Sequence, residues 1–83
     1  MKIIVTKNDI EQGVRRNHAH CPIALALKRR FPRQTVSVCL GHAQVGPNLY
    51  KLPWGVEDFI MRVDDKLPVE PMAFELNSFG SSQ

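Results

Sequence analysis

The chain has 83 residues, a formal net charge of +3 and 43% apolar residues, an apolar share close to the norm for globular proteins. This composition argues against disorder of the whole chain, and the length supports one hydrophobic core with little room for an enclosed catalytic cleft. No apolar run reaches about 18 residues and no signal peptide is present, which predicts a cytoplasmic protein without a membrane partner. We therefore expect a binding protein and no enzymatic activity.

Residues 2–5 form a β-branched run that predicts a first strand. Residues 7–12 then predict a helix of one or two turns, because the Thr6 hydroxyl can accept a hydrogen bond from the backbone near Asp9. Gly13 is expected to end this helix in the left-handed conformation. Residues 14–20 show no hydrophobic period, which indicates a loop.

Pro22 predicts the start of the first long helix, because its fixed φ and its missing N–H suit the first helical position. Alanine and leucine residues follow, and they are the best helix formers. The residues of positions 28–30 are all cationic, which suits the negative end of the helix dipole. Pro32 is expected to stop this helix.

Residues 35–40 alternate in polarity, which predicts a half-buried strand with Val36, Val38 and Leu40 toward the core. Gly41 and His42 are expected to form a two-residue hairpin turn that leads to a return strand over residues 43–45. Residues 46–48 predict another turn, and residues 49–52 extend the sheet.

Pro53 predicts the start of a second long helix, in which positions 56, 59, 60 and 63 form a buried apolar stripe. Alternating Met72, Phe74 and Leu76 predict a last strand. The sequence therefore predicts an α+β fold, in which a small, mostly antiparallel sheet combines the N-terminal strand, the central hairpin and the C-terminal strand, with two main helices packed on one face. We expect a single domain over residues 1–77 and a flexible C-terminal tail over residues 78–83.

Two histidines and two cysteines have the side chains that zinc prefers: His18, Cys21, Cys39 and His42. Structural zinc sites commonly combine two close pairs of ligands. Here the pairs would be His18 or His20 with Cys21, where His18 has the better spacing, and Cys39 with His42. The usual Cys-x-x-Cys knuckle is absent, however. The alternative is that Cys21 caps the helix, Cys39 is a small buried apolar group and the histidines lie in surface loops. We expect no cofactor and keep zinc as a secondary hypothesis.

Most cationic residues lie in the first half of the chain, whereas most acidic residues lie in the second half. Such an asymmetry forms either a basic face for an anionic partner or a solvated helix end. Aromatic side chains often anchor protein interfaces. The predicted binding surface consists of Arg15, Arg16, Arg29, Arg30, Arg33, Tyr50 and Trp54. Its expected partner is a protein or a protein–nucleic-acid complex, and nucleic acid alone is the alternative.

Three segments together resemble a family of short uncharacterised proteins encoded by tailed bacteriophages and prophages. They are the opening IIVTKNDIEQGV, the helix CPIALALKRR and the closing LPWGVEDFIMRVDDKLPVEPMAFEL. The resemblance extends over nearly the whole chain and supplies no catalytic residue. It implies a phage-borne accessory protein that binds and modulates a host macromolecule, such as an anti-CRISPR-like inhibitor of a bacterial defence complex. The alternative function is a small nucleic-acid-binding accessory protein.

Overall fold

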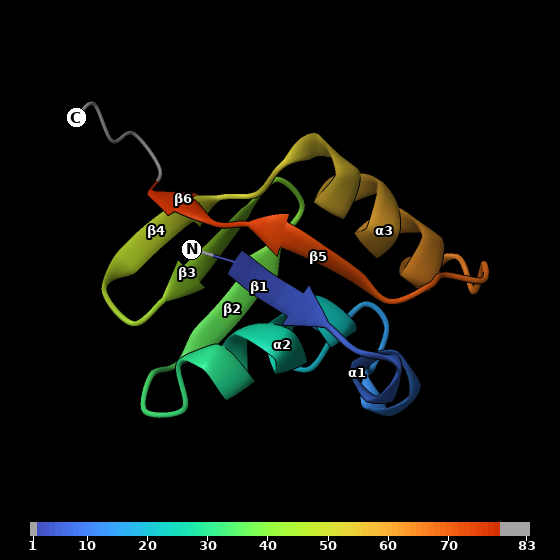
Figure 1. The fold of residues 1–83 in the computed structure, drawn as a ribbon, viewed down its shortest axis with the longest axis horizontal. Helices are drawn as coiled ribbons and strands as arrows, with labels where there is room; N and C mark the ends of the chain where they lie inside the picture. The colour runs from blue at the N-terminus through green and yellow to red at the C-terminus, as the bar shows by residue number, and fades with distance from the viewer. Residues whose placement is uncertain (1, 79–83) are drawn as a thin grey trace.

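The computed structural model describes residues 2–78, and the predicted α+β class is confirmed. Figure 1 shows the strands β2, β3 and β4 together on one side of the molecule, with α1 and the end of α3 on the other side. In chain order the elements are β1 (Lys2–Val5), α1 (Lys7–Gln12), α2 (Pro22–Arg30), β2 (Val36–Cys39), β3 (His42–Val45), β4 (Asn48–Lys51), α3 (Trp54–Asp64), β5 (Met72–Glu75) and β6 (Asn77–Ser78).

All strand pairs are antiparallel, and they form two sheets where the sequence predicts a single one. One sheet pairs β1 with β5, so that Ile3 lies opposite Phe74. The other has the order β2-β3-β4-β6. Only Leu76 separates β5 from β6, and its side chain is buried. The C-terminal segment therefore links the two sheets covalently while it contributes one strand to each.

The first helix begins as predicted and ends differently. Thr6 Oγ1 accepts a hydrogen bond from the Asp9 N–H at 3.2 Å, and the Thr6 N–H donates to Asp9 Oδ2 at 2.8 Å, which forms a capping box. Gly13 has a φ of −69°, so the predicted left-handed conformation is wrong. Glycine is required there for space, because a Cβ atom at Gly13 would lie 2.6 Å from Pro22 Cδ.

The second helix matches its prediction, with Pro22 at the first helical position. Cys21 Sγ accepts a hydrogen bond from the Ala24 N–H at 3.4 Å, so the thiol satisfies one of the free donors at the helix start. The side chains of Ile23, Ala24 and Leu27 are fully buried. They pack α2 against β1 and β2, which brings one strand of each sheet to the same helix.

The hairpin turn lies one residue earlier than predicted. Cys39 pairs with His42, so Leu40 and Gly41 form the turn and His42 begins β3. Gly41 adopts a φ of +94°, a conformation that L side chains rarely adopt. Leu40, predicted to face the core, is 55% exposed because the turn carries it off the strand.

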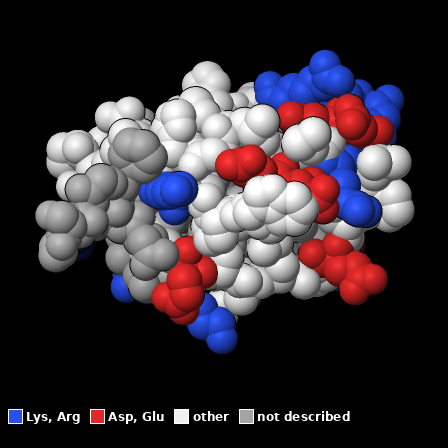
Figure 2. Space-filling view, turned by 90° about the horizontal axis from the view of Figure 1, so that it is seen from above, with Lys and Arg blue, Asp and Glu red and all other residues white. Residues whose placement is uncertain are grey.

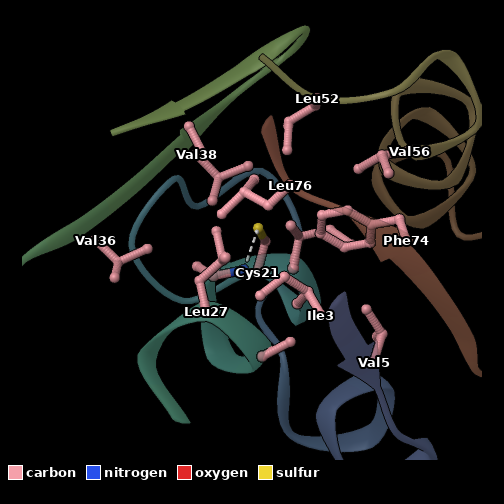
Figure 3. Packing of buried hydrophobic residues seen from close by; sticks show 14 of the residues in the cluster. Ile3, Val5, Cys21, Leu27, Val36, Val38, Leu52, Val56, Phe74 and Leu76 are labelled. Atoms are coloured by element: carbon pink, nitrogen blue, oxygen red, sulfur yellow. Dashed lines mark hydrogen bonds between the residues drawn. The ribbon is translucent and has the colours of Figure 1, made fainter. Parts of the chain in front are cut away.

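The predicted stripe of α3 faces the core, where Val56 and Phe59 are buried and Ile60 and Val63 pack at the margin. Pro53 is the capping residue and Trp54 the first helical residue, one position later than predicted. Figure 3 shows side chains from helices and both sheets meeting around the Cys21 sulfur. One cluster of apolar residues therefore unites the two sheets and the helices.

The domain boundary was predicted at residue 77, and the described structure extends to Ser78. Ser78 belongs to β6 and pairs with Tyr50 of β4. The rest of the predicted flexible tail, residues 79–83, lies outside the described residues. Within residues 2–78, no helix is long and apolar enough to cross a bilayer.

Candidate functional site

The four predicted metal ligands have different surroundings. Cys21 is buried, and this burial raises the pKa of its thiol, which disfavours the thiolate that binds metals. Cys39 is exposed at the end of β2, opposite His42. The loop that carries His18 lies against β2, because the His18 carbonyl oxygen accepts from the Val38 N–H at 2.8 Å. In the part of the chain described, no three His, Cys, Asp or Glu side chains gather around a possible metal position. Zinc binding stays a prediction.

The five predicted arginines do not form one patch. Arg15 and Arg16 precede the start of α2, whereas Arg29, Arg30 and Arg33 lie at and beyond its end. Nine helical residues span about 13 Å. Figure 1 shows the two ends of α2 directed to opposite sides of the molecule. The five arginines therefore do not lie on one continuous basic face.

Two of these arginines are occupied by intramolecular contacts. Arg29 forms a bidentate pair with the carboxylate of Asp9, with nitrogen-to-oxygen distances of 2.7 and 2.8 Å. The Arg16 backbone N–H donates to Asp64 Oδ1 at 2.8 Å, and its side-chain Nε donates to the Asp64 carbonyl oxygen at 3.3 Å. Arg16 thus fixes the loop before α2 to the end of α3. These contacts connect elements within the fold, so the Arg16 and Arg29 side chains are less available to a binding partner than an unpaired arginine is.

A cationic and aromatic group lies at the end of α2. The Arg30 guanidinium carbon is 5.4 Å from the centre of the Phe31 ring, within the range of a cation–π contact. The Phe31 and Tyr50 rings stack with their centres 6.3 Å apart. Arg33 is exposed beside this group and has no ion-pair partner within residues 2–78. Of the predicted surface, Arg30 and Tyr50 are therefore joined through Phe31, and Arg33 follows two positions later in the chain.

Trp54 lies at the start of α3, apart from the five predicted arginines. We give the name α3 outer surface to three exposed apolar side chains on or near this helix, those of Leu40, Trp54 and Met61. Trp54 is 80% exposed, and Met61 and Leu40 are 53% and 55% exposed. Met61 stands seven positions after Trp54, which is close to two helical turns and places both on one side of α3. Leu40 lies in the hairpin turn, which is held near the start of α3 because the Leu52 N–H donates to the Gly41 carbonyl oxygen at 3.0 Å. The Glu57 carboxylate borders this turn, since a Cβ atom at Gly41 would lie 3.2 Å from Glu57 Oε2.

A groove of about 260 Å³ lies beside this surface. Leu40 and Met61 line it together with Val38 and Ile60, and Arg16 and Asp64 form a polar margin. Sequence reasoning missed Leu40, because an alternating pattern assigned it to the core. The side of α3 away from the core also carries Glu57 and Asp58, and Asp58 pairs with Arg62 at 2.9 Å. Figure 2 shows acidic and basic groups interspersed on the face that contains α3, with an uncharged area between them.

Comparison of the chain with known protein families, curated proteins and solved structures gives no match.

Proposed function

We propose that this chain is a non-enzymatic binding protein that docks on another protein through the α3 outer surface. The observation that carries the proposal is the 80% exposure of Trp54 beside the half-exposed side chains of Met61 and Leu40. Tryptophan, together with tyrosine and arginine, is enriched among the few interface residues that contribute most of the binding energy. The groove between Leu40 and Met61 gives the same region a concave part into which a partner side chain fits.

The charges around the α3 outer surface favour a protein partner over nucleic acid. Glu57 and Asp58 lie on the helix between Trp54 and Met61, and Asp64 borders the groove. Asp58 and Asp64 already contact Arg62 and Arg16, so Glu57 is the one of these three carboxylates without a cationic partner in the described residues, and it repels phosphate groups and attracts lysine or arginine. The proposed partner surface therefore combines apolar side chains, which contact Trp54 and Met61, with a cationic side chain that faces Glu57. The resemblance to phage proteins supports a bacterial host protein, such as a subunit of a defence complex, as the partner to be modulated.

The experiment is a pull-down from bacterial lysate with the immobilised chain, with and without nuclease treatment. The test variant carries Trp54→Ala and Met61→Ala, and the matched control carries Arg30→Gln and Arg33→Gln. Both test residues are exposed, so the melting temperature of the test variant should stay within about 2 °C of the parent value. We expect a captured protein that survives nuclease and the control substitutions, and whose affinity falls at least about 30-fold in the test variant.

Two outcomes contradict the proposal. One is capture that the Trp54→Ala and Met61→Ala variant retains at parental strength. The other is capture that disappears after nuclease treatment, because this result identifies nucleic acid as the bridge.

A second candidate function is binding of single-stranded nucleic acid through Arg30, Phe31, Arg33 and Tyr50. The stacked rings and the adjacent guanidinium group favour it, because such sites combine cations with aromatic platforms. Fluorescence anisotropy with a labelled oligonucleotide tests this function. Two phosphate contacts predict a slope of about −1.4 in a plot of log affinity against log salt concentration. Binding that is independent of salt, or unchanged by Arg30→Gln with Arg33→Gln, would rule it out.

A further inference from the structure

A second groove, which we name the end groove, lies where α1 and α3 both terminate. It has a volume of about 580 Å³, within the range of about 300–1,000 Å³ typical of ligand sites. Three segments form its walls: the end of α1 with the loop after it, the end of α3, and residues 66–69. Its principal lining residues are Ile10, Val14, Arg15, Val63, Lys66 and Leu67.

The end groove combines aliphatic walls with two cations, and no carboxylate lines it. Val14 and Leu67 are each 50% exposed, so their apolar surface is open to a ligand. The side chains of Arg15 and Lys66 have no ion-pair partner in the described part of the chain. The groove therefore offers apolar contact and uncompensated positive charge at the same place.

Arg16, the neighbour of Arg15 in the chain, has acidic partners that Arg15 lacks within residues 2–78. Arg16 turns to the opposite side, where it contacts Asp64 and where its guanidinium lies 3.9 Å from Asp65. Consecutive residues thus face different grooves: Arg15 lines the end groove, and Arg16 lines the groove beside Met61. The acidic end of α3 neutralises Arg16 and leaves Arg15 without a counter-charge.

Lys66 is not required to close the end of α3. The Lys66 N–H donates to the Val63 carbonyl oxygen at 3.1 Å, and the Leu67 N–H donates to the Arg62 carbonyl oxygen at 2.8 Å. These two bonds form a Schellman motif, in which backbone groups satisfy the last helical carbonyls. Lys66 has a φ of +62° in this motif, at a position where glycine is the usual residue. The chain carries a lysine there at a conformational cost, and its ammonium group remains available to a ligand.

We propose that the end groove binds a linear peptide segment in which aliphatic residues stand next to carboxylates. The aliphatic walls match leucine, isoleucine or valine side chains, and the pair of cations matches aspartate or glutamate beside them. Nucleic acid fits less well, because the lining contains no aromatic side chain on which a base can stack. This site is separate from the α3 outer surface, so a partner contacts the chain at two places or two partners bind at once.

The first experiment is selection of peptides from a displayed library of random dodecapeptides on the immobilised full chain. We expect the enriched peptides to contain aspartate or glutamate adjacent to aliphatic residues. Their binding should weaken as salt is added, because the charge contacts are exposed. Enrichment of basic, aromatic or uncharged peptides overturns the proposal.

The second experiment measures the affinity of the best enriched peptide, labelled with fluorescein, for three double variants. Arg15→Gln with Lys66→Asn removes both cations, and asparagine tolerates the positive φ of position 66. Val14→Ser with Leu67→Ser removes apolar contact. Arg33→Gln with Lys51→Gln removes two exposed cations elsewhere and serves as the matched control. We expect the Kd to rise about tenfold in each of the first two variants and less than about twofold in the control.

Methyl NMR spectra provide a reading that does not depend on the variants. Peptide addition should shift the methyl signals of Ile10 and Val63 and leave that of Met61 unchanged. The proposal is overturned if Arg15→Gln with Lys66→Asn leaves the peptide affinity unchanged, or if the affinity falls equally in the control variant. NMR shifts centred on Met61 overturn it as well. The Trp54→Ala and Met61→Ala variant should bind the peptide normally, so failure of this site and failure of the proposed function are distinguishable.

Discussion

Arg29 donates to both carboxylate oxygens of Asp9 and to the carbonyl oxygen of Ile4, whereas Arg15 contacts no carboxylate within residues 2–78. The first residue lies at the end of α2 and the second in the loop before α2 begins. The Asp9 side chain is 3% exposed, so the Arg29 pair has one buried member, while Arg15 is surrounded by solvent at the margin of a groove. Arg29 therefore stabilises the packing of three elements, whereas the Arg15 side chain is available to bind a ligand.

The difference shows which charges a partner can use. Arg29 joins three elements, because Ile4 belongs to β1, Asp9 to α1 and Arg29 to α2. Its planar guanidinium satisfies two carboxylate oxygens at once, which a lysine cannot do. A net charge of +3 counts Arg29 and Arg15 equally, although only Arg15 is electrostatically uncompensated.

The largest expected effect breaks the Arg29 contact. Arg29→Ala leaves the buried Asp9 carboxylate without its cation and should lower the free energy of unfolding by about 2–3 kcal/mol. Arg15→Ala is the matched control and should change it by less than about 0.5 kcal/mol, because Arg15 has no partner to lose. Urea unfolding followed by circular dichroism measures both values. Equal effects of the two substitutions would refute the contrast between the two arginines.

Acid titration tests the same pair without truncating the arginine. Burial raises the pKa of Asp9, but hydrogen bonds from Arg29 and Thr6 outweigh it, so this pKa lies below its ordinary value of 3.8. The contribution of Asp9 to stability is therefore fully present above pH 3.8 and is lost as the pH falls through the folded-state pKa.

The measurement is the free energy of unfolding between pH 5 and about pH 2. We expect Asp9→Asn to remove part of the acid-induced loss of stability seen in the parent chain. Asp65→Asn serves as the control, because it removes a carboxylate that is 63% exposed, whereas the Asp9 side chain is 3% exposed. An identical pH profile for the parent chain and Asp9→Asn would show that Asp9 does not couple folding to pH.

The smallest expected effect lies in the end groove. Lys66→Gly relieves the positive φ and should raise the free energy of unfolding by about 0.5–1 kcal/mol, whereas Lys66→Ala keeps the strain and should not. Both substitutions remove the ammonium group and should weaken binding of the acidic peptide to the same extent. Thermal unfolding separates the two variants. A melting temperature for Lys66→Gly below that of the parent chain would contradict the argument that the Lys66 backbone is strained.

The local elements were predictable because their signals lie within a few residues of one another. Thr6 and Asp9 are three positions apart, and Pro22 defines the start of α2 by its own covalent geometry. The stripe of α3 follows from helical periodicity. The Gly13 prediction failed because a residue of another element decides the outcome: Pro22 approaches position 13 too closely for a side chain. The hairpin error is local, because Cys39 pairs with His42 and glycine is therefore the second residue of the turn, where the sequence predicts it as the first.

The candidate sites were less predictable than the fold. Trp54 was named as a possible interface anchor because aromatic side chains often serve that role, and the structure shows that it is 80% exposed; its role as an anchor stays a prediction. Lys66 and the end groove were not identified, because three segments that are separated in sequence create the groove together. The predicted union of Arg15 and Arg16 with Arg29, Arg30 and Arg33 is not observed, since the rigid length of α2 separates the two groups.

By itself, the sequence determined the helices, most strand positions and the α+β class, because periodicity, capping and proline geometry act over a few residues. The tertiary structure alone decided that the strands divide between two sheets, since β1 pairs with β5 across the length of the chain. It also decided which charged side chains have a counter-charge. An arginine is neutralised or left free by residues that only folding brings within about 4 Å, and no local pattern records that distance.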